Sequence, residues 1–514
     1  MQRIGIIDIG SNSARLVIAD IYKNGAYKMF FNQKNSLRLG QRFDDCNKFT
    51  DEAVNDLIET MKSFAYMCKV YKTDKIMAVA TAAMRKAVNG SEVLAKILEQ
   101  TGIDMNIISG EQEAYLSYLG VANTVDVKSG IVFDLGGGST EIILFKERKL
   151  IESVSIPIGA VNLTAMFNTK EAMSPALLEV VEQFIKSKLD QHPWLKQNNL
   201  PLIAVGGTGR TVAKVIQRAA KHPVTKLHNY PYSLETYNEF FQKIITTNLE
   251  QRRKISGLSK ERSDIILAGI CIIKGLLEVT GAKKIITSGC GLREGLFYKY
   301  YSTAKNKPEI APDILVESTE NMLNLYEMNQ DHARHVTELA LAMFDSWEKV
   351  HGLEQDYRKL LRTAALLHDI GISINYYSHA RHSAYMIQNA KLFGLSHKEQ
   401  YMVSIIAGWH NGYSKNYFKE AIANNVLPEN DWQILVKLAV ILCLAESLDY
   451  TNSKFVQKIE ATQSNNEAVL TIFAPDYPEI EMQEISEHKS WFKKAMGMNL
   501  VVKFKSTEYE AKVL

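Results

Sequence analysis

Two different rhythms of apolar and polar residues follow one another along the chain. Short apolar runs rich in β-branched residues occupy residues 76–81, 201–207 and 284–289, and such runs are typical of buried strands. Between them the apolar residues recur with the period of a helix. Alternating strands and helices predict an α/β fold with mixed sheets. The helical segments are expected at residues 51–71, 91–101 and 174–189.

The pattern of apolar and polar residues changes after Tyr301, where a polar stretch containing Pro308 predicts a linker. From about Ala311 to Glu460 almost every segment has helical periodicity, which predicts an all-helical domain. The tail returns to strand-like alternation and is too short to hold a core alone, so we expect it to be a small α+β element. The predicted domains are residues 1–123, 124–305, 312–460 and 461–514.

An internal repeat links the first two predicted domains. Residues 4–18 and 130–144 share one pattern at an offset of 126 residues, which pairs Asp8 with Asp134. In each copy an apolar run reaches the aspartate, turns through small residues and enters a second apolar run. This pattern predicts a hairpin with a tight turn, and its repetition predicts two related halves.

The turns of the two hairpins are candidate phosphate sites, because small residues leave backbone N–H groups free to bind phosphate oxygens. Asp8 and Asp134 stand at the preceding strand ends, where a carboxylate can hold Mg²⁺. No GxxxxGK[ST] motif is present, and the glycines near residue 207 lack the third glycine of a dinucleotide fingerprint. The turn residues are Gly10, Ser11, Asn12 and Ser13, and Gly136, Gly137, Gly138, Ser139 and Thr140.

The composition of the chain bears on which classes of binding partner are expected. The 514 residues include 60 Lys and Arg against 57 Asp and Glu, a net charge of +3, so there is no general electrostatic reason to bind nucleic acid or a membrane. Basic residues are dense between Lys186 and Lys260, Arg210 among them, and are candidates for a polyanion track. The five cysteines form no CxxC pair, and no apolar stretch has the length of a membrane span, so we expect a cytoplasmic protein.

Several motifs together resemble the exopolyphosphatase and guanosine pentaphosphate phosphohydrolase (Ppx/GppA) family, of the actin-like acetate and sugar kinase superfamily. The resemblance covers nearly the whole chain and implies a duplicated actin-like α/β fold with a C-terminal HD-like helical domain. Its carriers are DIGSNSARL from Asp8, ATAAMRKAVN around Arg85, IISGEQEA from Ile107, FDLGGGSTE from Phe133, AVGGTGRT from Ala204, ERSDIILAG from Glu261 and SGCGLREG from Ser288.

The resemblance implies that the terminal phosphate of a phosphoanhydride chain is removed in a cleft between the two halves. Glu113 matches the family's general base for the attacking water, and Glu141 matches its second essential acid. Glu111 would share a face with Glu113 on a strand but not at the start of a helix. Arg85 and Arg293 are expected to neutralise phosphate oxygens. The residues expected to hold Mg²⁺ are Asp8, Asp134 and Glu141.

The helical domain resembles the HD domain of metal-dependent phosphohydrolases. The resemblance implies a divalent metal held by the first histidine, the His-Asp pair and a late aspartate in an apolar helix. Two further histidines are candidates for a second ion. Ile372 stands where many catalytic HD sites have lysine, which weakens a catalytic role but not a metal site. The expected ligands are His332, His368, Asp369 and Asp449, with His382 and His410 for the second ion.

Three functions are compatible with these motifs. The first is a Mg²⁺-dependent exopolyphosphatase that releases orthophosphate, with guanosine pentaphosphatase activity in addition or instead. The second is an ATP-dependent phosphotransferase of the kinase branch, and the third is an alarmone or polyphosphate sensor with a metal-binding HD site. Glu113 and Glu141 favour the hydrolase. The resemblance also implies a homodimer.

Overall fold

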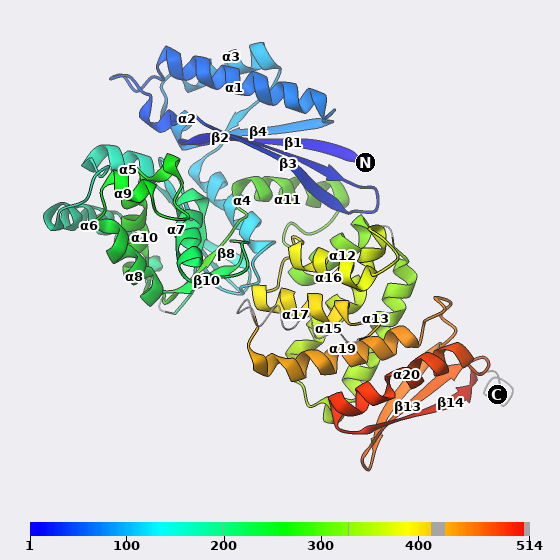
Figure 1. Cartoon of the computed structure of the whole chain (residues 1–514). Helices are drawn as coiled ribbons and strands as arrows, with labels where there is room; N and C mark the ends of the chain where they lie inside the picture. Colours follow the sequence, from blue (N-terminus) through cyan, green and yellow to red (C-terminus); the bar gives the residue numbers. More distant parts are fainter. Residues whose placement is uncertain (198, 327, 413–426, 508–514) are drawn as a thin grey trace. The chain divides into compact units, whose positions relative to one another are not determined.

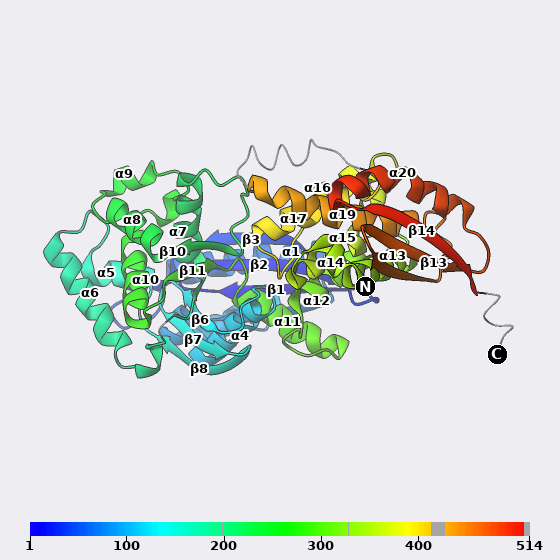
Figure 2. The same ribbon diagram turned by 90° about the horizontal axis from the view of Figure 1, so that it is seen from below.

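The computed structural model describes residues 1–507 except residues 198, 327 and 413–426. The chain forms two compact units, Met1–Ile314 and Leu315–Leu514 (Figures 1 and 2). The first unit contains two sheets, and the second contains helices followed by a small third sheet. The predicted α/β pair of halves, helical domain and α+β tail are confirmed.

The first sheet has the strand order β3-β2-β1-β4-β5. Strand β1 pairs antiparallel with β2 and parallel with β4, which in turn pairs parallel with β5. β2 also pairs antiparallel with β3. The strands are β1 (Gln2–Ile9), β2 (Ser13–Ile21), β3 (Tyr27–Ser36), β4 (Lys75–Ala80) and β5 (Asn106–Ile107).

The second sheet repeats this topology. Its order is β10-β11-β9-β6-β7-β8. Strands β8, β7, β6, β9 and β11 take the places of β3, β2, β1, β4 and β5 with the same strand directions, and β10 adds an antiparallel edge. The predicted duplication is therefore present in the sheets as well as in the hairpins. The strands are β6 (Gly130–Leu135), β7 (Thr140–Lys146), β8 (Lys149–Ile156), β9 (Leu202–Val205), β10 (Tyr230–Ser233) and β11 (Lys284–Thr287).

Helices cover both faces of the first sheet. Helices α1 (Asp51–Val70) and α3 (Gly90–Thr101) pack on one face through a buried apolar core. Helix α1 starts where its sequence requires, because the Thr50 side chain accepts a hydrogen bond from Ala53 N. The other face packs on helix α11 (Leu292–Lys305), which comes from the end of the unit.

The second sheet is covered in the same two-sided way. One face carries the largest core of the unit, and the opposite face packs on helix α4 (Gly110–Ala122). The short helix α2 (Ala82–Lys86) follows β4, and α9 (Leu249–Arg253) follows α8. The helices that contribute to the large core are α5 (Ala160–Phe167), α6 (Pro175–Leu189), α7 (Gly206–Ala219), α8 (Leu234–Ile245) and α10 (Ile266–Thr280).

Helices α4 and α11 cross in direct contact between the two sheets. A Cβ atom on Gly295 would lie 1.8 Å from the Leu116 carbonyl oxygen, and one on Gly120 would lie 2.2 Å from that of Gly291. Only glycine permits so close an approach of two backbones. The crossing fixes the position of the first turn of α4, which carries Glu113.

The second unit is a bundle of helices with mostly buried apolar faces. A three-stranded sheet of order β12-β13-β14, packed with helix α20, completes it and confirms the predicted tail. Within the described residues, no helix is both long and apolar enough to cross a membrane. The elements are α12 (Ile314–Leu325), α13 (Gln330–Ser346), α14 (Glu348–His351), α15 (Arg358–Leu367), α16 (His379–Asn389), α17 (His397–Gly408), α19 (Trp432–Ser447), β12 (Lys458–Ser464), β13 (Glu467–Ala474), α20 (Glu479–Met496) and β14 (Asn499–Ser506).

Candidate functional site

The two repeated hairpins turn in the same way. Gly10 N donates to the Ser13 carbonyl oxygen at 3.1 Å, and Gly136 N donates to that of Ser139 at 3.0 Å. The two turns lie against each other, because a Cβ atom on Gly138 would come within 2.7 Å of Ser11 Oγ. The turns predicted to bind phosphate therefore face one another.

One pocket of the first unit is lined by both turns. Thr140 is not part of this lining, since its buried hydroxyl donates to the Ile158 carbonyl oxygen at 2.6 Å. The Thr140 side chain is thus bonded within the second half, and a phosphate contact through its backbone N–H stays a prediction. The predicted residues in the lining are Asp8, Gly10, Ser11, Asn12, Ser13, Glu113, Asp134, Gly136, Gly137, Gly138, Ser139 and Arg293.

Asp8 and Asp134 are the next-to-last residues of the first strand of each half, and they line the pocket from different sheets. Asp134 Oδ2 accepts a hydrogen bond of 2.6 Å from Ser117 Oγ. Burial raises the pKa of both carboxyls, so a bound cation would favour their charged forms. A set of oxygen donors in a pocket fits Mg²⁺.

Glu113 lies in the first turn of α4. Ser109 caps this helix through a capping box with Gln112, so the segment is helical from Gly110. Glu111 is consequently exposed, whereas Glu113 is only 9% exposed and lines the pocket. The sequence did not decide whether Glu111 and Glu113 share a face, and the helix places them on different faces.

Arg85 is the immediate partner of Glu113. Its Nη1 atom donates to Glu113 Oε2 and to the Ile108 carbonyl oxygen, both at 2.8 Å. Arg85 is not among the residues that line the pocket. In this structure Arg85 forms an ion pair that orients Glu113, and its expected contact with phosphate stays a prediction.

Glu141 and Glu113 form a pair of buried acids. Burial raises the pKa of Glu113 well above its usual range, and the Glu141 charge raises it further against the opposing effect of Arg85. Burial and the Asp134 charge raise the pKa of Glu141 to about 7, although Ser155 Oγ donates to it at 2.7 Å. An acid with the pKa of Glu141 can exchange a proton near neutral pH.

Four arginines converge on the pocket from four different elements: Arg15 on β2, Arg210 on α7, Arg262 on a short 3₁₀ helix, and Arg293 on α11. In the part of the chain that the structure describes, none of them forms an ion pair with a carboxylate. Burial, followed by repulsion from neighbouring arginines, lowers the pKa of Arg15 to about 10. The same two causes lower the pKa of Arg262 to about 10. An anion in the pocket would relieve this repulsion.

Arg15 and Arg262 were missed by the sequence analysis, and Arg210 was only one of many candidates for a basic track. The repeat itself contains a signal for Arg15, which stands opposite Asp8 across the hairpin. Arg252, another basic residue of that stretch, is buried and bonds backbone carbonyl oxygens, so it is structural.

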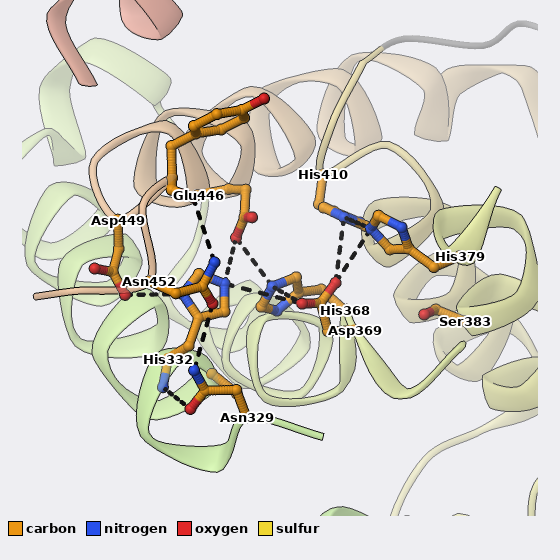
Figure 3. Close-up of polar contacts among 12 residues, drawn as sticks. Asn329, His332, His368, Asp369, His379, Ser383, His410, Glu446, Asp449 and Asn452 are labelled. Carbon is orange, nitrogen blue, oxygen red and sulfur yellow. Dashed lines mark hydrogen bonds and ion pairs between the residues drawn. The ribbon is translucent and has the colours of Figure 1, made fainter. Parts of the chain in front are cut away.

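The helical unit holds a second cluster of polar residues (Figure 3). It comprises two groups of three side chains that could each hold a metal ion. Asp449 is not in either group, because its Oδ2 contacts His332 Nδ1 rather than Nε2. His382 is also outside both groups and packs against Gly371. The groups are His332, His368 and Glu446, and Asp369, His379 and His410.

The two groups differ from the predicted ligand set in two places, and which residues bind a metal stays a prediction. Glu446 stands in place of Asp449, one turn earlier on the same helix, and His379 stands in place of His382, one turn earlier on α16. Each pair is separated by three residues, so helical periodicity alone does not decide between its members.

Comparison with known proteins agrees with this architecture. The model of the Ppx/GppA phosphatase family matches residues 17–304, and that of the Ppx/GppA phosphatase, domain III, matches residues 314–482. A guanosine-5'-triphosphate,3'-diphosphate pyrophosphatase of Pseudoalteromonas translucida is 28% identical over 452 residues, covering 86% of this chain and 88% of that protein.

Solved structures share the fold of the first unit. The crystal structure of an exopolyphosphatase from Cytophaga hutchinsonii matches with a TM-score of 0.55 at 24% identity, covering 60% of this chain and 100% of that chain. The crystal structure of the Aquifex aeolicus member of the Ppx/GppA family has a TM-score of 0.52 at 28% identity, with 59% and 98% covered. Since the family match spans more than half of its residues, this chain belongs to the Ppx/GppA phosphatase family.

Proposed function

We propose that this phosphatase is a Mg²⁺-dependent exopolyphosphatase, which hydrolyses the terminal phosphate of inorganic polyphosphate and releases orthophosphate. The observation that carries the proposal is the group of four arginines around two facing turns, which form no ion pair with any carboxylate of the described residues. Their surplus positive charge suits a chain of phosphates better than a single neutral substrate. Family membership supports phosphoanhydride hydrolysis as the reaction class.

In the proposed reaction, the backbone N–H groups of the two turns and the arginines hold the terminal phosphates. Asp8, Asp134 and Glu141 would hold Mg²⁺, which when bound neutralises phosphoryl oxygens. Glu113 accepts a proton from a water in line with the terminal phosphorus. Arg85 keeps the Glu113 carboxylate oriented by their 2.8 Å hydrogen bond.

Glu113 also separates hydrolysis from phosphotransfer. A kinase has to exclude water from the transferred phosphoryl group, whereas a phosphohydrolase has to activate it. A carboxylate with a raised pKa in the pocket lining is suited to that activation. We therefore favour the hydrolase over the phosphotransferase.

Guanosine pentaphosphate is the second candidate substrate. It is favoured by the relative from Pseudoalteromonas translucida, whose name specifies a guanosine-5'-triphosphate,3'-diphosphate pyrophosphatase. The same cleft would bind its 5'-triphosphate, and the two activities differ only in the second product. We also retain the predicted homodimer as a proposal, which light scattering tests as twice the mass of the chain.

The test is orthophosphate release from long-chain polyphosphate and from guanosine pentaphosphate, each with Mg²⁺. Glu113→Gln should lower turnover by about 10²–10⁴, the usual contribution of a general base. Glu111→Gln is the matched control, because this neighbouring acid is exposed and should leave turnover unchanged. Turnover by Glu113→Gln above roughly a tenth of wild type would remove the base assignment. If orthophosphate is released from guanosine pentaphosphate but not from polyphosphate, guanosine pentaphosphate becomes the proposed substrate.

Tight binding without release from either substrate would instead support the sensor. ATP consumption with a small acceptor, in the absence of polyphosphate hydrolysis, would support the phosphotransferase. His368→Gln, in the helical unit, should leave release intact if the first unit performs the reaction. Loss of release in that variant, with activity retained in Glu113→Gln, would place the reaction in the helical unit.

A further inference from the structure

A hydrogen bond joins helix α4 to one of the acids that line the pocket of the first unit. Ser117 Oγ donates to Asp134 Oδ2 at 2.6 Å, which lies in the range of about 2.5–2.7 Å for a hydroxyl bound to a charged carboxylate. Ser117 is fully buried on α4, whereas Asp134 lines the pocket. The bond therefore connects the interior of the unit to a residue that is expected to hold Mg²⁺.

This bond is not the one that a hydroxyl in a helix usually makes. Serine and threonine side chains in helices commonly donate to a carbonyl oxygen one turn earlier in the same helix. In this chain Thr164 donates in this way to Ala160 O at 2.7 Å. Thr280 does the same to Leu276 O at 2.6 Å. Ser117 instead donates to a strand of the second sheet, so its hydroxyl serves a residue outside its own helix.

The crossing of α4 and α11 shows that this donor belongs to one half only. The two close approaches of a glycine to the facing backbone keep one offset, since 295 − 120 and 291 − 116 are each 175. The two helices therefore cross around an approximate two-fold axis. At the same offset Ser117 corresponds to Leu292, whose side chain is apolar. Helix α11 thus offers Asp8 no matching donor at that position.

The hydrogen bond also selects which oxygen of Asp134 is held. Oδ2 accepts from Ser117. Oδ1 lies beside Gly206, because a Cβ atom on that glycine would come within 2.9 Å of it. Gly206 lines the pocket, as Asp134 itself does. Oδ1 is therefore the oxygen that is left for a cation.

Ser117 and the proposed base Glu113 lie on the same face of α4, four residues apart. This separation amounts to about 6 Å along the helix axis, at roughly 1.5 Å per residue. The crossing with α11 prevents α4 from sliding, because the backbones of the two helices approach each other at glycines. One rigid helix therefore sets the position of Glu113 and, through Ser117, that of Asp134.

We propose that Ser117 is a positioning residue for metal binding, which holds Asp134 by Oδ2, leaves Oδ1 for Mg²⁺ and fixes this acid relative to Glu113. Ser117 touches neither the ion nor the substrate and acts through Asp134. The inference rests on the proposed function, because that function assigns Mg²⁺ to this cleft. A hydrogen-bonded partner of a metal ligand contributes about 10- to 100-fold to metal affinity.

The first measurement uses no substrate. The Tm of the whole protein is recorded at increasing Mg²⁺ concentrations, since an ion that binds the folded state raises it. Ser117→Ala should require roughly 10- to 100-fold more Mg²⁺ than wild type for the same rise in Tm. Any Mg²⁺ bound in the helical unit is common to all variants and cancels in the comparison. In an Asp134→Asn background, Ser117→Ala should change the Mg²⁺ response no further, because the carboxylate that Ser117 positions is already lost.

Two more substitutions of Ser117 separate the hydrogen bond from packing. Ser117→Thr keeps a hydroxyl and should respond to Mg²⁺ as wild type does. Ser117→Cys keeps a similar volume but has only a weak donor, so it should respond as Ser117→Ala does. The cysteine variant decides alone if the larger threonine disturbs folding, which the Tm without Mg²⁺ shows.

Ser302→Ala is the matched control. Ser302 is also a buried serine within a helix, but its hydroxyl donates to the Lys299 carbonyl oxygen at 2.9 Å rather than to an acid of the pocket. The same substitution at this position should leave the Mg²⁺ response unchanged. An equal loss of response in Ser302→Ala would show that the effect of Ser117→Ala comes from general loosening of the helices.

The second measurement is orthophosphate release at varied Mg²⁺, with polyphosphate and with guanosine pentaphosphate. Ser117→Ala should raise the Mg²⁺ concentration for half-maximal release by the same factor and leave the KM for the phosphate substrate at saturating Mg²⁺ unchanged. A wild-type Mg²⁺ response in Ser117→Ala or Ser117→Cys, or no stabilisation of wild type by Mg²⁺, would overturn the proposal. If wild type releases no orthophosphate from either substrate, the proposed hydrolysis fails, while the first measurement still decides the role of Ser117.

Discussion

Arg15 and Glu141 occupy equivalent positions in the two repeated hairpins. Arg15 pairs across the first hairpin with Asp8, and Glu141 pairs across the second with Asp134. Both pairs keep the repeat offset, since 141 − 15 and 134 − 8 are each 126. The duplicated backbone therefore presents a cation from one half and an acid from the other. In the proposed reaction, Arg15 would bind phosphate and Glu141 would hold a cation or a proton.

This difference predicts opposite effects on activity and stability for one substitution. Arg15→Gln should lower kcat/KM by roughly 10- to 100-fold, the loss of a charge-assisted hydrogen bond. It should also raise the Tm without substrate, because it removes one of several mutually repelling cations. Thermal unfolding with and without orthophosphate measures both effects, since phosphate should stabilise wild type more than the variant.

Arg218→Gln is the control for this prediction. Arg218 lies on the same helix as Arg210, but its side chain is exposed and bonds Ser256 Oγ. It should change neither kcat/KM nor the response to phosphate. A lower Tm for Arg15→Gln than for wild type, both without phosphate, would show that its positive charge is satisfied within the protein.

The pH dependence of hydrolysis follows from the raised pKa of Glu113. A base must be deprotonated to accept a proton, so kcat/KM should fall as the pH is lowered through that pKa. Because burial and Glu141 raise it, the loss should occur at a higher pH than for an ordinary glutamate. A pH–rate profile at saturating Mg²⁺ measures this limb, which belongs to the coupled Glu113–Glu141 pair. An acidic limb near pH 4.5 would contradict the prediction.

Gly207 provides a steric test of Arg262. A Cβ atom at this position would lie 1.7 Å from an Nη atom of Arg262, so Gly207→Ala should displace the guanidinium from the pocket. We expect a loss of kcat/KM similar to that of Arg262→Gln. The double variant should lose little more than either single one, because both remove the same contact. Additive losses would mean that the two residues act independently.

Asp449 is predicted to support metal binding by the group of His332, His368 and Glu446 without being a ligand itself. Its carboxylate accepts from His332 Nδ1 at 2.8 Å and also from Lys454 N at 2.7 Å. Asp449→Asn should weaken Mn²⁺ binding by roughly 10- to 100-fold, as is usual for a partner of a ligating histidine. Competition with a chelator measures the affinity. Binding of an ion by the group of Asp369, His379 and His410 should be affected less, and equal weakening at both groups would contradict this assignment.

The sequence predicted the features that are formed by residues close together in the chain. The Asp-Gly-Ser pattern of the hairpins is continuous in the chain, so both turns and the strands that flank them were found. Glu113 was found because its motif is local as well, and its helical position was decided only by the cap at Ser109. These features depend on neighbours within a few residues.

The remaining features depend on tertiary packing. Arg15 and Arg262 are more than two hundred residues apart in sequence and meet only because two sheets and a 3₁₀ helix converge. The choice of Glu446 over Asp449 depends on how α19 is rotated against α13. Periodicity identifies the buried stripe of a helix but not which of two acids three residues apart faces a partner.

Helix α11 follows the strands of the second sheet in sequence but packs on the first sheet, and this has a consequence for the synthesis of the chain. The apolar face of the first sheet, which includes Ile4 and Val17, is covered by Phe297 and Tyr301 of α11. During synthesis, this apolar face therefore stays uncovered until almost three hundred residues have been made and α11 can pack on it. The first half is therefore the first part of the unit to emerge, and one of its apolar faces is among the last to be covered.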